Sequence, residues 1–392
     1  MNAIVRESLR FRPDVERPDP AHLDAMISVV LDRIDRALPG FIDTFPAPSG
    51  TDGSYAAIGN VEWTNGFWTG MLWLAWELTG AEQYKAAAER QGSTFAERVK
   101  RRINVDHHDL GFLYSLSSCA EHRLTGSLDA REAGLEAARL LLARYDPVAQ
   151  IIQAWGDMAD PEQRGRMIID CNLNLPLLWW ASDQTGDRAF RIAANSHLRQ
   201  AARWLVRPDG STFHTFFMDT ETGQPRFGRT HQGHSDDSCW ARGQAWGIYG
   251  FALGWRHLGD PQLVTLSRKL ANYFLNRLPS DQIACWDLVF TDDGETPRDS
   301  SAAAIAACGL LELAAALPLC DADRDTYLTN AWRIVRTLDE KYLAQLRGSN
   351  AVLGHAVYHM PNGVGVDEPC IWGDYFYLEA LMRLRRVWTP YW

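Results

Sequence analysis

Hydrophobic positions recur with helical spacing along most of the chain, and the alternation typical of strands is scarce. Residues 19–38 form a first amphipathic pattern, with apolar positions on one helix face. One unit then repeats: a helix that is apolar almost all round, a short turn, and an amphipathic charged helix. The apolar members are predicted at residues 65–78, 111–124, 172–184, 243–258, 301–317 and 373–387. The amphipathic members are predicted at residues 83–99, 128–144, 188–206, 261–278 and 321–343.

These helices are expected to pair into a closed ring. A helix that is apolar all round is buried, and an amphipathic helix covers it with its polar face to water. Six such pairs, with residues 19–38 supplying the sixth outer helix, indicate a repeat architecture. Closure needs no polar capping repeats, which an open solenoid would require. We therefore predict an all-α fold, an (α/α)6 barrel, in which residues 1–392 form a single domain with residues 1–18 as an N-terminal extension.

The connections between the predicted helices are unequal in length. Turns from an inner helix to the next outer helix are short, whereas the segments that lead back to an inner helix are long and polar. The long segments are residues 39–64, 100–110, 145–171, 207–242, 279–300 and 347–372. One mouth of the barrel should therefore carry most of the loops, and a binding or catalytic site is expected there.

Composition excludes several classes of partner. The formal net charge is -10, so no global basic field would attract nucleic acid or an anionic membrane. No apolar run approaches the roughly 18 residues that span a bilayer, and the charged, proline-bearing N-terminus does not read as a signal peptide. Seven cysteines lack any Cys-x-x-Cys spacing, which favours buried free thiols and a cytoplasmic location. Sixteen tryptophans favour a carbohydrate ligand.

Residues 230–250 join a polar, histidine-rich loop to a predicted apolar helix. Arg242 and Trp246 are four positions apart, so they share one helix face. An indole that stacks on a sugar ring and a guanidinium that forks onto a carboxylate would suit an acidic sugar. The alternative is a core helix whose arginine is satisfied by its neighbours, and the stretch alone leaves both open.

Acidic residues precede several predicted inner helices. Asp170 follows three apolar residues, so burial should raise the pKa of its carboxyl group. Alternatively, Asp170 caps the helix, and backbone N–H groups would then lower its pKa. Asp109 has the same two interpretations. Asp299 and Asp374 are expected to be structural, because any helical barrel needs such caps.

Two histidine clusters raise the question of a metal. One is the Asp-His-His-Asp sequence at residues 106–109, and the other lies within residues 231–237. Neither has a pair of ligands at i and i+4 on a predicted helix, nor a cysteine partner at ligand spacing. The sequence also lacks a dinucleotide-binding glycine motif, a Walker loop and a Gly-x-Ser-x-Gly elbow. We expect no metal and no cofactor.

Taken in order, the loop motifs closely resemble those of the unsaturated glucuronyl hydrolases, glycoside hydrolase family 88. These enzymes remove the 4,5-unsaturated uronic acid that polysaccharide lyases leave on oligosaccharides. The resemblance covers nearly the whole chain and implies the (α/α)6 barrel that the helix pattern predicts independently. The segments that carry it are residues 63–68, 106–109, 151–156, 170, 214–215, 230–250 and 371–380.

The resemblance also implies roles for individual residues. It makes Asp170 the general acid and base, with Asp109 as its carboxylate partner. The residues implied to contact the sugar are His214, Gln232 and Arg242, the aromatic walls Trp63, Trp155, Trp240 and Trp246, and, as a further candidate, His108. Asn65 stands where the family often has an aspartate, so no charged role is implied at this position.

The implied reaction is hydration of the vinyl ether double bond at the non-reducing end of an unsaturated oligosaccharide. Residues 359–368 contain neither serine nor lysine, residues that relatives acting on sulfated disaccharides often use there, and they include two acids. We therefore expect unsulfated or neutral sugars at the next subsite. Competing interpretations are an unsaturated rhamnogalacturonyl hydrolase, a sugar 2-epimerase on the same barrel, and a non-catalytic sugar-binding barrel. A monomer and a homodimer are both compatible with the sequence.

Overall fold

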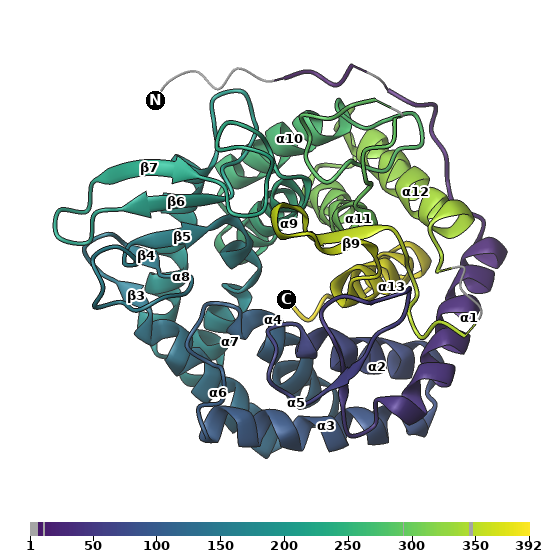
Figure 1. Cartoon of the computed structure of the whole chain (residues 1–392), viewed down its shortest axis with the longest axis horizontal. Coiled ribbons are helices and arrows are strands. Elements are labelled where there is room, and N and C mark those ends of the chain that lie inside the picture. The colour runs from purple at the N-terminus through teal and green to yellow at the C-terminus, as the bar shows by residue number, and fades with distance from the viewer. Residues whose placement is uncertain (1–6, 11, 293, 345–347) are drawn as a thin grey trace.

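The computed structural model describes residues 7–10, 12–292, 294–344 and 348–392. Its helices form two concentric rings around a common axis (Figure 1). The inner ring comprises α2 (Asn65–Thr79), α4 (Leu110–Tyr114) with α5 (Ala120–Thr125), α7 (Pro176–Thr185), α9 (Ala241–Leu258), α11 (Ser300–Ala316) and α13 (Ile371–Arg385). The outer ring comprises α1 (Pro20–Ala37), α3 (Glu82–Lys100), α6 (Leu128–Ala143), α8 (Arg188–Gln200), α10 (Pro261–Leu275) and α12 (Arg324–Lys341).

Contacts between the helices close the ring. Each inner helix before α13 packs against the outer helix that follows it, as α2 does on α3 and α9 does on α10. The last inner helix, α13, packs on both α1 and α2, so the two ends of the chain meet. The predicted all-α (α/α)6 barrel is confirmed. The division of the chain into one domain and an extension stays a prediction, and residues 1–6 and 11 of that extension lie outside the described residues.

Small residues bring the inner helices close together. Gly66 on α2 faces the backbone carbonyl of Phe112, and Gly111 on α4 faces the backbone of Asn174. A side chain at either glycine would overlap these backbone atoms, which cannot move away as a flexible side chain could. The close approach places the first turns of α2 and α4 and the turn before α7 side by side, beneath the loops at one mouth.

Some helix boundaries differ from those predicted. The segment 111–124 is interrupted by a π-helical turn, Ser115–Cys119, between α4 and α5. The segment 172–184 begins with a 3-10 turn, Ile169–Leu173, and α7 begins only at Pro176. Proline has no N–H to donate into a preceding turn and is favoured at the first position of a helix. The segment 188–206 ends in a second π-helical turn, Ala201–Leu205.

The long connections form small antiparallel sheets that helical periodicity does not predict. β1 (Phe45–Pro46) pairs with β2 (Ala57–Ile58), and β3 (Tyr145–Asp146) pairs with β4 (Ile151–Ile152). β5 (Arg166–Ile168), β6 (Thr215–Met218) and β7 (Pro225–Arg229) form a three-stranded sheet at one side of the ring (Figure 1). β8 (Ala356–His359) and β9 (Val364–Glu368) form a hairpin before α13.

The end of the chain packs inside the ring (Figure 1). The Trp392 ring stacks on Phe376 and meets Phe112 edge-on, and its Nε1 donates a hydrogen bond to Glu379. Phe112 in turn contacts Trp63, 5.7 Å away between ring centroids. A continuous aromatic core therefore supports the loops at the mouth. No helix in the described part of the chain is long and apolar enough to cross a membrane.

Candidate active site

A cavity of about 550 Å³ opens among the long loops, at the mouth of the barrel predicted to carry a site. Its lining is rich in aromatic, histidine and carboxylate side chains. The lining residues are Val61, Glu62, Trp63, Asn104, Asp106, His107, His108, Asp109, Trp155, Asp170, His214, His231, Gln232, Tyr358 and His359. A larger hollow of about 720 Å³ lies on the outside between α3 and α6, but its lining contains no aromatic or histidine residue. The first cavity is therefore the candidate site.

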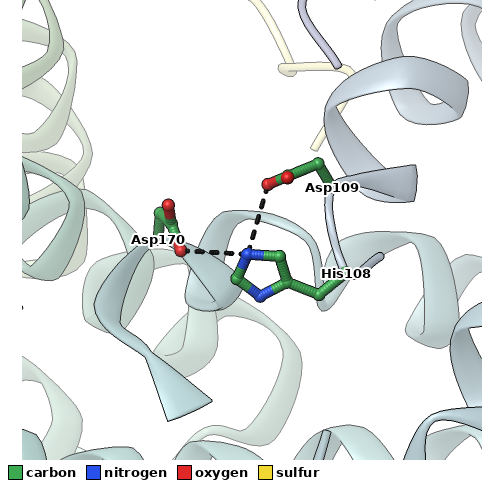
Figure 2. A group of neighbouring side chains, drawn as sticks. All are labelled: His108, Asp109 and Asp170. Atoms are coloured by element: carbon green, nitrogen blue, oxygen red, sulfur yellow. Dashed lines mark ion pairs between the residues drawn. The ribbon is translucent and has the colours of Figure 1, made fainter. Parts of the chain in front are cut away.

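Three side chains meet on the floor of this cavity (Figure 2). His108 and Asp109 directly precede α4, and Asp170 lies in the 3-10 turn before α7. Nε2 of His108 is 3.3 Å from Oδ1 of Asp109 and 3.4 Å from Oδ1 of Asp170. His108 is 1% exposed, whereas the two carboxyl groups are 18% and 19% exposed. One buried imidazole therefore lies between two carboxyl groups that face the cavity.

Burial raises the pKa of Asp170 well above its usual value, and the negative charge of Asp109 raises it further. Arg242 and two backbone N–H groups act in the opposite direction without reversing the shift. Oδ1 of Asp170 is buried and has no hydrogen-bond partner among the described residues. A protonated carboxyl group avoids placing a second negative charge there, so Asp170 can act as an acid near neutral pH.

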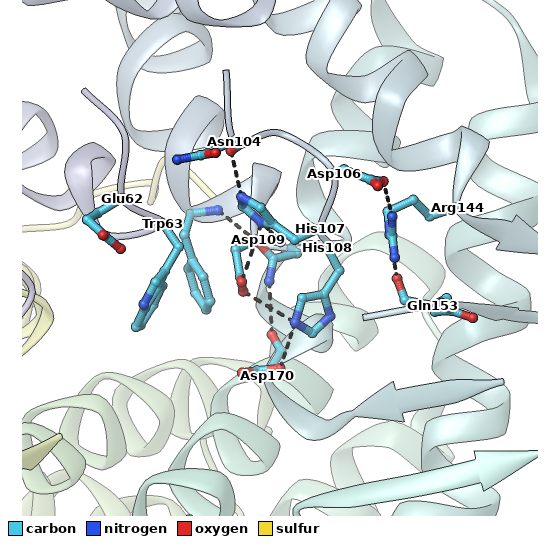
Figure 3. A network of polar contacts seen from close by, with 12 residues as sticks. Glu62, Trp63, Asn104, Asp106, His107, His108, Asp109, Arg144, Gln153 and Asp170 are labelled. Carbon is cyan, nitrogen blue, oxygen red and sulfur yellow. Dashed lines mark hydrogen bonds and ion pairs between the residues drawn. The ribbon is translucent and has the colours of Figure 1, made fainter. Parts of the chain in front are cut away.

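Asp109 behaves differently although it is equally enclosed. Burial alone would raise its pKa, but His108, His107 and Asn174 outweigh that effect and lower it. The His107 ring is held in place because its Nε2 contacts the Asn104 carbonyl at 2.9 Å (Figure 3). Burial lowers the pKa of His108 to about 4, so its imidazole is neutral near pH 7. The floor therefore pairs an ionised Asp109 with a protonated Asp170.

Arg144 ties the surrounding loops together (Figure 3). Its guanidinium bonds to Asp106 and donates to the backbone carbonyls of Gln153 and Gly156. The backbone N–H of His108 donates to the carbonyl of Ala154 at 2.7 Å. These bonds fix the loop that carries His108 and Asp109 against the loop that carries Trp155.

The helix-cap interpretation fails for the two central acids and holds for one other. Asp109 occupies the N-cap position of α4 but makes no capping hydrogen bond, and Asp170 lies inside its turn. Asp299 caps α11 by accepting hydrogen bonds from the N–H groups of Ser301 and Ala302. Asp374 is structural, as predicted, but it is not a cap: it lies inside α13 and holds the loop before β8 through backbone N–H groups.

His214 has a defined tautomer. Its Nδ1 accepts hydrogen bonds from the backbone N–H groups of His231 and Gln232, at 3.0 and 3.1 Å. Burial lowers the pKa of His214 well below its usual value, and His231 and Arg242 lower it further. A neutral imidazole whose Nδ1 accepts must carry its proton on Nε2. His214 can therefore donate a hydrogen bond into the cavity, and it is poorly suited to act as a base.

Arg242 lies behind the cavity and is not among its lining residues. Its Nη1 bonds to Asp299 at 3.3 Å and to the Val357 carbonyl, while Nη2 bonds to the Tyr358 carbonyl at 2.7 Å. Nη2 also lies 3.5 Å from Oε1 of Gln232, which does line the cavity. The structure thus places Arg242 next to the site through Gln232, with much of its hydrogen-bonding capacity used by the protein.

The four predicted tryptophan walls separate into two layers. Trp63 and Trp155 line the cavity, and Nε1 of Trp63 donates to the Tyr358 hydroxyl at 3.1 Å. Trp240 lies one layer back, 4.3 Å from the His214 ring between centroids. Trp246 packs against aromatic side chains of the core, including Phe112 at 5.2 Å. Neither Trp240 nor Trp246 is among the lining residues.

Other lining residues carry no prediction from the sequence. Tyr358 and His359 come from the β8–β9 hairpin, and Asn104 comes from the loop after α3. Tyr358 accepts the hydrogen bond from Trp63, so it orients an aromatic wall. The hairpin has no strong sequence signal apart from Asn362 and Gly363 at its turn, which explains why Tyr358 was missed.

Comparison with known proteins places these residues in a family context. Residues 34–354 match the Glycosyl Hydrolase Family 88. The unsaturated chondroitin disaccharide hydrolase of Streptococcus pneumoniae (strain ATCC BAA-255 / R6) is 47% identical over 367 residues, which cover 93% of this chain and 92% of the relative. The unsaturated glucuronyl hydrolase of Bacillus sp. (strain GL1) is 47% identical over 358 residues, covering 91% and 95%.

Solved structures give the same result. The unsaturated glucuronyl hydrolase from Streptococcus agalactiae superposes with a TM-score of 0.95 and 42% identity over 100% of both chains. The enzyme from Bacillus sp. GL1, described as responsible for the degradation of glycosaminoglycan, superposes with a TM-score of 0.90 and 45% identity, covering 93% of this chain and 97% of that one.

Proposed function

Because the chain belongs to glycoside hydrolase family 88, we propose that it removes a 4,5-unsaturated uronic acid from the non-reducing end of lyase-generated oligosaccharides. Relatives named as unsaturated chondroitin disaccharide and unsaturated glucuronyl hydrolases support this reaction. The observation that carries it is the carboxyl group of Asp170, which faces the cavity with a raised pKa beside Asp109. An acid held neutral at the mouth of the barrel suits protonation of a vinyl ether.

The first step is proton transfer to carbon. The Asp170 hydroxyl gives its proton to carbon 4, the C4–C5 π electrons form the new C–H bond, and an oxocarbenium-like cation remains at carbon 5. Asp170 thereby becomes a carboxylate. Asp109 is already ionised, so the floor of the site is negative when the cation forms and stabilises it electrostatically.

The second step adds water. The Asp170 carboxylate takes a proton from a water molecule while the oxygen of that water attacks carbon 5. This step restores the protonated acid and yields a hemiketal at carbon 5. The hemiketal opens to a ketone and exposes the hemiacetal at carbon 1, which expels the remaining sugar. Since carbon 5 reacts and no glycosyl–enzyme bond forms at carbon 1, the carboxyl spacing rules for ordinary glycosidases do not apply.

The walls of the cavity would orient the sugar. Trp63 and Trp155 offer aromatic faces. His214 supplies a neutral Nε2–H donor, and Gln232, backed by Arg242, supplies an amide near the same wall. We propose that His108 positions the two carboxyl groups. Trp240 and Trp246 would act through His214 and Phe112, not by direct contact.

Loss of ultraviolet absorbance from the conjugated double bond tests the proposal. Wild type should consume the absorbance of an unsulfated unsaturated chondroitin disaccharide and release an equal amount of the second sugar. Asp170→Asn keeps the shape of the side chain without its acidic proton, and should lower kcat at least about a hundredfold. Asp32→Asn, an exposed carboxylate of α1 paired with Arg36, serves as the control. Near-normal turnover by Asp170→Asn would refute the role of Asp170.

We also propose that sugars at the next subsite are preferably unsulfated where they meet the β8–β9 hairpin. This hairpin carries Asp367 and Glu368, and it contains neither serine nor lysine. A mutant of the Streptococcus agalactiae enzyme has been solved with dGlcA-GalNAc6S, a sulfated disaccharide. Faster turnover of a sulfated than of an unsulfated disaccharide by the present enzyme would contradict this preference.

A cytoplasmic location is a further proposal. All seven cysteines lie in the described part of the chain and are free, six of them buried and Cys320 exposed. Unpaired thiols suit a reducing compartment. The choice between a monomer and a homodimer stays a prediction that sedimentation can decide.

A further inference from the structure

The three-stranded sheet beside the cavity has one face with two rows of aligned residues. Arg166, Phe217 and Phe227 are register partners across β5, β6 and β7. Ile168, Thr215 and Arg229 form the next row, two residues along each strand. Residues two apart on a strand point to the same side, so Arg166 and Arg229 share one face of the sheet.

Arg166 is fixed against a wall of the cavity. Its guanidinium lies 4.7 Å from the ring centroid of Trp155 and 5.2 Å from that of Phe217. Trp155 lines the cavity and contacts His231, another lining residue, at 5.3 Å between centroids. Aromatic contacts on Trp155 and Phe217 hold the cation in place without neutralising it.

Neither Arg166 nor Arg229 has a carboxylate within ion-pair distance among the described residues, whereas Arg164 pairs with Glu221 at 2.5 Å. Burial lowers the pKa of Arg166, and the charge of Arg229 lowers it further, which shows that the two cations repel each other. Arg166 is half-buried and Arg229 is exposed, and neither is neutralised by a carboxylate among the described residues. Such a pair of cations is suited to bind an anion, and guanidinium groups match carboxylate and sulfate oxygens.

We propose that Arg166 and Arg229 form an anion-binding subsite at the rim of the cavity, which takes a carboxylate or sulfate on a sugar that follows the unsaturated uronic acid. This inference rests on the proposed function. We assign the ligand to a following sugar because the carboxylate of the unsaturated sugar is attached to carbon 5, next to the carbon that Asp170 protonates. Asp170 lines the cavity, whereas neither Arg166 nor Arg229 is among its lining residues.

Two kinds of substrate could supply the anion. A sulfated unsaturated disaccharide carries it on the second sugar, and an unsulfated unsaturated tetrasaccharide with a second uronic acid carries it on the third. The unsulfated unsaturated disaccharide has no anion beyond its first sugar and is the internal reference. Both rates and affinities should be measured on all three.

Arg229→Gln is the main variant. Arg229 is exposed on β7, an edge strand of this sheet, so its replacement should not disturb folding. Arg166→Gln is the second. Arg164→Gln removes a cation from the same region that already has a partner, and is the matched control. We expect Arg229→Gln and Arg166→Gln to lower kcat/KM about tenfold on the tetrasaccharide or the sulfated disaccharide, mainly through KM. The reference disaccharide should change less than about twofold.

The pattern across substrates decides the proposal. A loss confined to the tetrasaccharide identifies the carboxylate as the ligand. A loss confined to the sulfated disaccharide identifies the sulfate, and it would also count against the preference for an unsulfated second sugar proposed above. Equal losses on all three substrates, no loss on any, or the same loss in Arg164→Gln would overturn it. If wild type consumes none of them, the proposed function fails by itself. Calorimetric binding of the tetrasaccharide and the sulfated disaccharide then decides the subsite: weaker binding by Arg229→Gln supports it, and unchanged binding overturns it.

Discussion

Nε2 of His108 lies 3.4 Å from Oδ1 of Asp170, an oxygen that has no hydrogen-bond partner among the described residues. The same nitrogen lies 3.3 Å from Asp109. A neutral imidazole therefore separates a carboxyl group with a raised pKa from one with a lowered pKa. The buried floor holds one negative charge instead of two, which is the state that acid catalysis by Asp170 requires.

The first prediction concerns the pH profile. Activity requires protonated Asp170, so it should be present below the raised pKa of this group and lost as pH rises through it. Activity also requires ionised Asp109, so it should be lost as pH falls through the lowered pKa of that group. A plot of kcat/KM against pH should be bell-shaped, with the alkaline limb set by Asp170.

Asp109→Asn tests whether Asp170 sets the alkaline limb of the plot of kcat/KM against pH. It removes the negative charge that raises the pKa of Asp170, so the alkaline limb of the remaining activity should move to lower pH by about one unit or more. Asp32→Asn removes an exposed charge on α1 and should leave the limb in place. An unmoved alkaline limb in Asp109→Asn would show that Asp170 is not the group titrating there.

A second prediction concerns the proton on His214. Because two backbone N–H groups donate to Nδ1 and burial lowers the pKa, the ring should stay neutral with its proton on Nε2. Nitrogen NMR of labelled histidine should find this tautomer from about pH 8 down to about pH 6, where an ordinary histidine becomes charged. A cationic His214 at the lower pH would contradict the assignment.

Much of the fold could be predicted because the inner helices are apolar on nearly every side. Their ends were harder to place. α7 begins at Pro176 because the preceding residues form a 3-10 turn, and the π-helical turn Ser115–Cys119 leaves no mark on the hydrophobic pattern. The strands have two to five residues and are fixed by partners far along the chain, as Ile168 is by Thr215. Local periodicity contains no such information.

For the site, the sequence could predict which residues matter but not their environments. The sequence motifs identify Asp109, His108 and Asp170 as candidate site residues. They do not decide whether each aspartate is a helix cap or a buried acid, because that choice depends on neighbours brought together by the fold. The hydrogen-bond partners of Arg242 could not be predicted from the sequence either. Its partners, the carbonyls of Val357 and Tyr358, lie more than a hundred residues away in a hairpin that the sequence did not predict.

A third prediction concerns stability and Asp374. Burial raises its pKa to about 7, although it accepts hydrogen bonds from Val352, Leu353 and Tyr55. Because its folded-state pKa is raised, Asp374 contributes most to the free energy of unfolding below its unfolded pKa, about 4. That contribution is lost as pH rises through about 7.

Asp374→Asn cannot ionise and should remove this dependence. The variant should lose about 1–3 kcal/mol at acidic pH, because an amide replaces one accepting oxygen by a donor. Its deficit relative to wild type should shrink as pH rises from about 4 to about 7. Urea unfolding at several pH values measures both effects, with Asp32→Asn as the control. A deficit that stays constant with pH would contradict the raised pKa.

A fourth prediction concerns metals. Ligand atoms of His108, Asp109 and Asp170 lie within 4.8 Å of one another, a spacing that a metal ion could use. A metal would have to displace the proton that Asp170 needs, so Zn²⁺ should inhibit, and more strongly as pH rises. A chelator should leave activity unchanged, and Mg²⁺, which disfavours imidazole, should have little effect. Loss of activity on chelation and its recovery with Zn²⁺ would show instead that the site uses a metal.

The last prediction concerns Asn65 and the buried guanidinium of Arg98. Arg98 is 1% exposed and is held by neutral acceptors, among them the carbonyls of Glu62 and Asn104 and, at 3.4 Å, Oδ1 of Asn65. Burial lowers the pKa of Arg98 to about 10, although Tyr114 and Glu62 act in the opposite direction. Its hydrogen-bond acceptors among the described residues are all neutral. The amide nitrogen of Asn65 is itself buried without a hydrogen-bond partner among the described residues.

Asn65→Asp should therefore stabilise the protein. The new carboxylate keeps the oxygen that accepts from Glu62 N–H at 2.8 Å, removes the unsatisfied donor, and gives Arg98 a counterion. We expect a gain of about 1–2 kcal/mol in the free energy of unfolding, measured in urea near neutral pH. The gain should vanish in the background of Arg98→Gln, because an isolated buried carboxylate is unfavourable without the cation. Asn65→Ala, which removes the acceptor, should destabilise. If Asn65→Asp is less stable than wild type while Arg98 is present, the cation does not need a counterion.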